Sequence, residues 1–116
     1  VDRFLARRMV ETVGAGELVL DLGAGTGALT IPLAQAGARV VAVEADPVWA
    51  ERLFGQLVGA GLSGMVELVV GDMLEVPLPS EPYRVVSNPP YGITTALLRR
   101  LLELPERGPY RADLLL

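Results

Sequence analysis

The sequence contains no cysteine, no histidine and no lysine. These absences exclude disulfides, cysteine–histidine zinc sites and acid–base catalysis by an imidazole, and we expect no metal centre. Long hydrophobic runs are also absent: none approaches the roughly 18–20 apolar residues that a membrane-spanning helix needs. No signal-peptide pattern is present either. We therefore expect a cytoplasmic protein that does not engage a membrane.

Positive charge is scarce, and all ten basic residues are arginine. The 116 residues include 14 acidic side chains, which gives a net charge of −4. Because phosphate contacts dominate the affinity of proteins for nucleic acids, this balance argues against strong nucleic-acid binding by the chain alone. Hydrophobic residues make up 51% of the sequence, and the length suits one domain, residues 1–116, around one core.

Glycine, in contrast, is concentrated in residues 21–27, Asp-Leu-Gly-Ala-Gly-Thr-Gly. A short apolar run typical of a buried parallel strand comes just before it at 18–20, in a strand predicted at 17–22, and a helix predicted at 26–36 follows and ends at Gly37. Three glycines at alternate positions let the backbone pass close to a ligand where a Cβ atom would clash. A strand, a glycine turn and a helix form the first unit of nucleotide-binding α/β domains.

The spacing of these glycines bears on the kind of ligand. A dinucleotide fingerprint reads G-x-G-x-x-G, whereas here the third glycine comes one residue earlier. A carboxylate at Asp21 would repel a diphosphate but suits a cation, such as the amino group of an amino-acid moiety. The segment resembles the first motif of S-adenosylmethionine-dependent methyltransferases, and a nicotinamide-dependent dehydrogenase is the alternative.

The second distinctive segment is Asn88-Pro89-Pro90-Tyr91, which follows a strand-like run at 84–87. Two consecutive prolines cannot lie inside a central strand or helix. They stiffen a loop at the carboxyl end of a strand, where open α/β sheets hold their ligands. The loop resembles the active-site loop of methyltransferases that alkylate an exocyclic amine, and the alternative is an ordinary proline turn.

Strand and helix patterns alternate along the whole chain. Further strands are predicted at 39–43, 65–70 and 112–116, and further helices at 3–13, 47–59 and 93–104, with caps at Asp2 and Asp46. This alternation predicts right-handed crossovers and a Rossmann-like α/β domain, in which a mostly parallel sheet carries helices on both faces.

The order of these segments resembles the ribosomal-RNA adenine dimethyltransferases over nearly the whole chain. That family includes a housekeeping small-subunit enzyme and large-subunit enzymes that confer macrolide–lincosamide–streptogramin resistance; residues 94–102 look more like the resistance branch. The resemblance implies S-adenosylmethionine as cofactor, an adenine amine of 23S ribosomal RNA as substrate, antibiotic resistance as the consequence, and a strand order that starts 3-2-1-4-5.

The resemblance also assigns roles to single residues. Glu44 would bind the ribose hydroxyls and Asp72 the adenine amine, while Met73 and Ala45 would cover the two faces of the adenine. The implied cofactor-binding residues are Asp21, Gly23, Ala24, Gly25, Gly27, Glu44, Ala45, Asp72, Met73 and Asn88. Without a ligand, Glu44 would be a solvated loop acid and Asp72 a cap for the next turn.

The catalytic residues implied are Asn88, Pro89, Pro90 and Tyr91. The Asn88 side-chain oxygen and the Pro89 carbonyl would accept the hydrogens of the adenine amine, and Tyr91 would stack on the base. Position 89 departs from the family, which usually has isoleucine or leucine there. Asn-Pro-Pro-Tyr is also typical of enzymes that methylate DNA adenine or a release-factor glutamine. These substrates stay open, as do 16S ribosomal RNA and a non-catalytic nucleic-acid-binding descendant.

The two ends of the sequence indicate a fragment, because it lacks a starting Met and ends in an apolar run at 114–116. We expect that the family's N-terminal cofactor segment and C-terminal helical domain are missing, and that the fragment alone does not methylate RNA. We also expect its open sheet edge to favour self-association. A modest basic patch could come from Arg3, Arg7, Arg8, Arg99 and Arg100.

Overall fold

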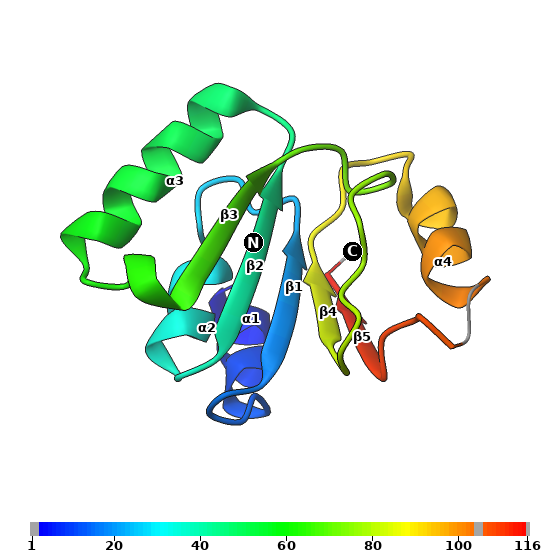
Figure 1. Cartoon of the computed structure of the whole chain (residues 1–116), viewed down its shortest axis with the longest axis horizontal. Helices are drawn as coiled ribbons and strands as arrows, with labels where there is room; N and C mark the ends of the chain where they lie inside the picture. The colour runs from blue at the N-terminus through cyan, green and yellow to red at the C-terminus, as the bar shows by residue number, and fades with distance from the viewer. Residues whose placement is uncertain (1–2, 104–105, 116) are drawn as a thin grey trace.

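The computed structural model describes residues 3–103 and 106–115. Within them, a single sheet has the order β3-β2-β1-β4-β5, and each neighbouring pair of strands is parallel. Figure 1 shows, from left to right, β3 (Val66–Val70), β2 (Arg39–Glu44), β1 (Leu18–Leu22), β4 (Arg84–Ser87) and β5 (Arg111–Leu114). The predicted Rossmann-like parallel sheet and its strand order are confirmed.

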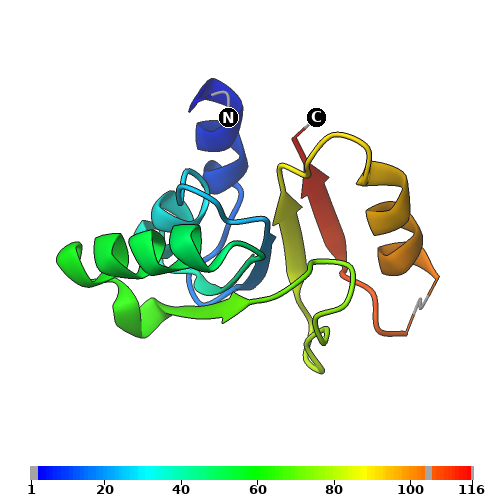
Figure 2. The same cartoon turned by 90° about the horizontal axis from the view of Figure 1, so that it is seen from above.

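Helices cover both faces of the sheet (Figure 2). One face carries α1 (Arg3–Glu11), α2 (Thr30–Gln35) and α3 (Pro47–Gly59), and the other carries α4 (Thr94–Leu102). Alternate residues of the central strand β1 enter the two cores, with Val19 in the first and Leu20 in the second. No helix in the described part of the chain is long and apolar enough to cross a membrane.

The largest difference from the sequence prediction concerns the helix after the glycine turn. The pattern predicts a helix from Thr26, but α2 begins at Thr30. Gly27 explains the delay, because its φ of +83° lies outside the right-handed helical region. The predicted cap at Asp2, the helix end at Leu104 and the strand end at Leu116 fall outside the described residues.

The start of α3 follows the prediction closely. Asp46 is the N-cap, and its Oδ1 accepts the Val48 N–H at 2.9 Å. Pro47 occupies the first turn, where its fixed φ and missing N–H are tolerated. At the other side of the sheet, β5 is an edge strand of the described chain. Self-association through that edge stays a prediction.

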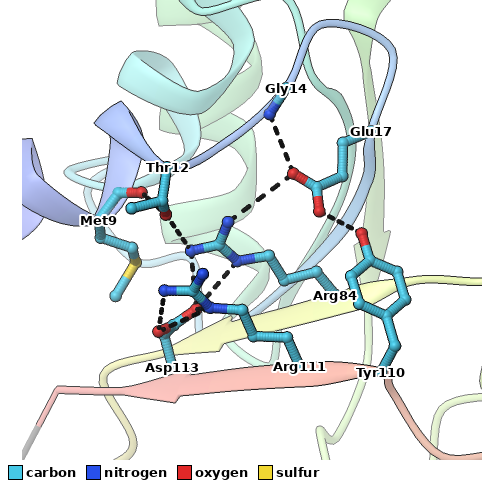
Figure 3. Close-up of polar contacts among 8 residues, drawn as sticks. All are labelled: Met9, Thr12, Gly14, Glu17, Arg84, Tyr110, Arg111 and Asp113. Atoms are coloured by element: carbon cyan, nitrogen blue, oxygen red, sulfur yellow. Dashed lines mark hydrogen bonds and ion pairs between the residues drawn. The ribbon is translucent and has the colours of Figure 1, made fainter.

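A buried arginine joins the elements at the amino ends of the strands (Figure 3). Arg84, at the start of β4, is 1% exposed. Its Nε donates to Asp113 Oδ2 at 2.9 Å, and its Nη2 donates to Thr12 Oγ1 at 2.7 Å. The Glu17 carboxylate lies 3.7 Å from Nη1 and accepts the Tyr110 hydroxyl. These five residues, the Arg84 cluster, connect α1, β4, β5 and the entrance to β1, and the sequence patterns did not predict them.

Candidate functional site

The predicted site residues gather at one edge of the sheet, to which β1, β2, β3 and β4 all run (Figure 1). We call this the carboxyl edge: the glycine turn at 21–27 after β1, Glu44 at the end of β2, Asp72 after β3, and Asn88 after β4. Parallel strands bring their carboxyl ends to the same edge. The topology therefore joins segments that lie far apart in the sequence.

The glycine turn crosses over the end of β2. The amides of Gly23 and Ala24 both donate to the Val43 carbonyl, at 2.8 and 2.9 Å. Gly23, Gly25 and Gly27 have φ values of +78°, +53° and +83°, which L residues rarely adopt. A Cβ atom at Gly25 would meet only the Gly23 carbonyl, 3.8 Å away. The turn thus leaves room for a ligand beside Gly25.

Asp21 lies beneath this turn and is 1% exposed. Its Oδ2 accepts the Thr30 hydroxyl at 2.5 Å. Burial raises the pKa of the Asp21 carboxyl to about 6, and the nearby Glu44 charge adds to this, while the Thr30 hydrogen bond opposes it. A cation bound near this carboxylate would favour its charged form, as the predicted amino group would.

Glu44 joins the glycine turn to the loop before α3. Its Oε1 accepts the Gly25 N–H, and its Oε2 accepts the Asp46 N–H, both at 2.8 Å. A carboxylate offers about four lone-pair directions, so each oxygen can accept one more hydrogen bond. Ala45, the next residue, is exposed. Glu44 is therefore a well-anchored acceptor rather than a freely moving loop acid, and it retains capacity for two hydroxyl donors.

The segment after β3 touches the glycine turn. Met73 is 7% exposed, and its Cε lies 3.0 Å from the position that a Cβ at Gly23 would take. Asp72 is exposed, and its Oδ1 accepts the Leu74 N–H at 2.8 Å. Asp72 thus caps the following turn, as the alternative interpretation predicted. This contact occupies one carboxylate oxygen and leaves the other able to accept a hydrogen bond from a ligand.

The loop after β4 is tied to the end of β1. Ser87 is buried, and its Oγ donates to the Leu22 carbonyl at 2.7 Å. This bond places Asn88 beside the glycine turn: the Asn88 carbonyl oxygen is 4.0 Å from the Cβ position of Gly23. Asn88 and Tyr91 are both exposed, Tyr91 completely. Their side chains are accessible to a substrate.

Three residues that hold this edge together were not predicted from the sequence: Thr30, Ser87 and Arg100. Thr30 and Ser87 carried no recognisable signal, because a hydroxyl that binds a distant carboxylate or carbonyl looks like any other. Arg100 was predicted only as a possible member of a modest basic patch; in the structure it is half-buried, and its guanidinium donates to the Met73 carbonyl at 2.7 Å and to the Val76 carbonyl.

Two further features of the described residues bear on the site. No three acidic side chains among them gather closely enough to hold a metal ion. A groove of about 900 Å³ lies over β1, β2 and β3, between Val41, Val69 and the connection at 76–81. None of the predicted site residues lines this groove.

Three comparisons relate the chain to known proteins. Ribosomal RNA small subunit methyltransferase A of Leifsonia xyli subsp. xyli is 44% identical over 109 residues, which is 89% of this chain and 39% of that protein. The crystal structure of the 23S rRNA methyltransferase ErmE matches with a TM-score of 0.78 at 37% identity, covering 91% of this chain and 43% of that one. The glycopeptide N-methyltransferase MtfA, complexed with S-adenosylhomocysteine, matches with a TM-score of 0.71 at 26% identity, covering 87% and 43%.

The sheet order and the carboxyl edge define the class of this protein: an open parallel α/β domain of the methyltransferase type. A family model, ribosomal RNA adenine dimethylase, matches residues 5–116, and the chain belongs to that family. The family predicted from the sequence is thus confirmed. The chain spans 39% of the Leifsonia protein's length. The roles of individual site residues stay predictions.

Proposed function

We propose that the chain is the cofactor-binding and catalytic core of an S-adenosylmethionine-dependent rRNA adenine-N6 methyltransferase. The observation that carries this proposal is the meeting of three segments at Gly23, where Met73 and the Asn88 carbonyl both approach the glycine turn. The cofactor side and the substrate side of a methyl transfer have to adjoin in this way. Membership of the family supports the proposal.

The residues at the carboxyl edge fit an S-adenosylmethionine molecule by their chemistry. The open space at Gly25 would admit a ligand next to the backbone, and the Asp21 carboxylate, buried beneath the turn, would attract a cationic amine bound there. Glu44 keeps two lone pairs for ribose hydroxyls, and Asp72 keeps an oxygen for the adenine amine. When bound, the cofactor supplies an activated methyl group.

The substrate side needs alignment more than acid–base power. Methyl transfer forms a nitrogen–carbon bond on the adenine amine and breaks the sulfur–carbon bond of the donor, and the displaced proton leaves to water. The Asn88 side-chain oxygen and the Pro89 carbonyl would accept the two amine hydrogens and aim the nitrogen lone pair. Tyr91, fully exposed, would stack on the extruded base. The two prolines restrict the loop that carries these groups.

The substrate we propose is an adenine of 23S ribosomal RNA, with macrolide-type resistance as the consequence. The match to the 23S rRNA methyltransferase ErmE over 91% of the chain supports it. The similarity to a small-subunit methyltransferase supports the alternative, 16S ribosomal RNA. Exposed arginines of the described chain include Arg3, Arg7 and Arg8 on α1 and Arg99 on α4, but Arg39 and Arg111 pair with carboxylates, and acidic residues outnumber basic ones by 14 to 10. We therefore assign RNA methylation to a longer, cytoplasmic protein that contains this chain.

The role of Asn88 can be tested in that longer protein. Asn88→Ala should still bind S-adenosylhomocysteine but should lose methyl transfer to RNA by about 100-fold or more, because an oriented acceptor at the reacting amine is removed. Gln56→Ala, which also removes an exposed amide but on α3, is the matched control and should retain activity. Undiminished activity of Asn88→Ala would refute the proposed role.

The choice of substrate needs a separate measurement. Transfer of a labelled methyl group to unmethylated 23S RNA, 16S RNA and adenine-containing DNA should label the 23S RNA alone. Label in 16S RNA alone would contradict the 23S proposal and leave adenine methylation of RNA standing. Label in DNA alone would reject the RNA substrate. Oxidation or reduction of a nicotinamide cofactor without any methyl transfer would reject the reaction itself.

A further inference from the structure

Arg100 is placed between the substrate loop and the cofactor side of the carboxyl edge. It lies on α4, next to Leu101, which is buried in the core, and next to Arg99, which is exposed. Its Nη1 donates to the Met73 carbonyl at 2.7 Å, and its Nη2 donates to the Val76 carbonyl. A planar guanidinium can hold two carbonyls at once, which an ammonium does less well.

The partner of Arg100 is the turn at residues 72–76. The amides of this turn are bonded within it: the Asp72 carbonyl accepts the N–H groups of Glu75 and Val76, both at 2.9 Å, and Asp72 Oδ1 accepts that of Leu74. Its outward carbonyls remain to be satisfied, and a cation beside such carbonyls is favourable. Arg100 provides that cation from a helix 24 or more residues away in the sequence.

The position of the 72–76 turn matters because Met73 lies against the glycine turn at Gly23. A shift of the turn would move both Met73 and its neighbour Asp72 relative to Gly23. The helix that carries Arg100 begins at Thr94, just after the loop with Asn88 and Tyr91. Arg100 therefore fixes the distance between the substrate loop and the two residues predicted to hold the adenine.

We propose that Arg100 is a positioning residue for the adenosine half of the cofactor. This inference rests on the proposed cofactor site and deepens it. Arg100 acts through the Met73 and Val76 carbonyls, which hold the turn at 72–76. Its contribution is to hold Asp72 and Met73 where an adenine ring can be bound between them and Ala45.

The test uses three variants of the longer protein that contains this chain: Arg100→Gln, Arg100→Lys and, as the matched control on the same helix, Arg99→Gln. Hydrogen exchange reports whether the amides of residues 74–76 open faster. Calorimetric titration with S-adenosylhomocysteine and with 5′-deoxy-5′-methylthioadenosine reports cofactor affinity. The second ligand keeps the adenosine and lacks the amino-acid part, so it isolates the half that Arg100 is proposed to position.

In Arg100→Gln we expect faster exchange at 74–76 and a Kd about tenfold higher for both ligands, because two charge-assisted hydrogen bonds are lost. Arg100→Lys should recover part of the affinity by reaching one carbonyl. Arg99→Gln should leave exchange and both Kd values unchanged. A loss confined to S-adenosylhomocysteine would place the effect at the amino-acid end and overturn the inference.

Failures of the two proposals give different results. A wild-type longer protein that binds neither ligand would overturn both the cofactor site and the role of Arg100. A wild-type longer protein that binds both ligands, with equal Kd values in the Arg100 variants, would overturn the role of Arg100 alone. A lower melting temperature without a change in Kd would show a purely structural role. If Arg100→Gln does not fold, the Kd of Arg100→Lys decides in the same way.

Discussion

The two ends of the sheet use polar side chains in opposite ways. At the amino ends, Arg84 is 1% exposed, and Asp113, Thr12 and Glu17 surround it. At the carboxyl edge, Asp21, Thr30 and Ser87 are also buried and bonded within the protein, but Asp72, Asn88 and Tyr91 face solvent. Among the described residues, no buried side-chain nitrogen or oxygen lacks a hydrogen-bond partner at either end.

This difference distinguishes polar side chains that stabilise the fold from polar side chains that are available to bind a ligand. A polar group whose partners are all protein groups contributes to the folded state, because removing one partner leaves another uncompensated. A polar group that keeps unused lone pairs toward solvent contributes little to folding and is available to a ligand. We therefore expect substitutions in the Arg84 cluster to alter stability, and substitutions at the carboxyl edge to alter cofactor binding or catalysis.

The strongest test of this division is Arg84→Met. It leaves the Asp113 and Glu17 carboxylates without their buried cation, so the free energy of unfolding should fall by about 3 kcal/mol. Urea unfolding measures the change. Arg111→Met is the matched control: Arg111 also pairs with Asp113, but its side chain is 47% exposed, and a loss under about 1 kcal/mol is expected. Equal losses in the two variants would contradict the special role of burial.

Substitution of Asp21 tests whether a buried residue of the carboxyl edge lowers the free energy of unfolding at neutral pH. Its folded pKa of about 6 exceeds the ordinary value of 3.8, so the folded state binds the extra proton between these pH values. Stability from this group is therefore fully present below about pH 4 and is lost as the pH rises through 6, by about 3 kcal/mol in total. Asp21→Asn should lack this loss and be more stable at pH 7.

The measurement for Asp21 is the free energy of unfolding from pH 4 to 7, compared between wild type and variant. Asp72→Asn, an exposed carboxyl of the same edge, serves as the control and should follow the wild-type profile. Asp21→Asn should also weaken S-adenosylhomocysteine binding, because the carboxylate for the amino group is gone. A variant with the wild-type pH dependence would show that Asp21 is not the group responsible.

The smallest expected effect concerns Asp46, which lies at the carboxyl edge but has a structural role. Asp46→Ala removes the N-cap of α3 and should cost about 1 kcal/mol. It keeps the backbone N–H that donates to Glu44, so cofactor affinity should stay within about twofold of wild type. Glu51→Ala, in the middle of the exposed face of α3, is the control for stability. A large loss of cofactor affinity in Asp46→Ala would contradict a purely structural role for Asp46.

Local patterns predicted the parts of the site that depend on neighbours in the chain. Alternate glycines at 23, 25 and 27 indicated a turn after the first strand, and the structure has that turn, with positive φ at all three. Apolar runs indicated the strands, and Pro47 after Asp46 indicated the start of α3. The helix after the glycine turn was predicted to begin at Thr26, four residues before its observed start at Thr30. The prediction was wrong because the positive φ of Gly27 cannot continue a right-handed helix.

Local sequence patterns could not predict the contacts between segments that lie far apart in the chain. Arg84 and Arg100 look like surface arginines in the sequence, yet one is buried among acids and the other holds two carbonyls. Asp72 illustrates a mixed case, since it was predicted both as a ligand and as a cap, and the structure shows the cap.

The amino-acid sequence was sufficient for the order of strands and helices, the glycine turn and the Asn88 loop, because each depends on the conformational preferences of a few adjacent residues. It was not sufficient for the contacts that Arg84 and Arg100 make with distant segments, nor for which arginines are exposed. Those depend on which strands are neighbours and on how far each helix is rotated against the sheet. Packing of two cores on opposite faces sets both, and it does so through contacts between residues remote in the chain.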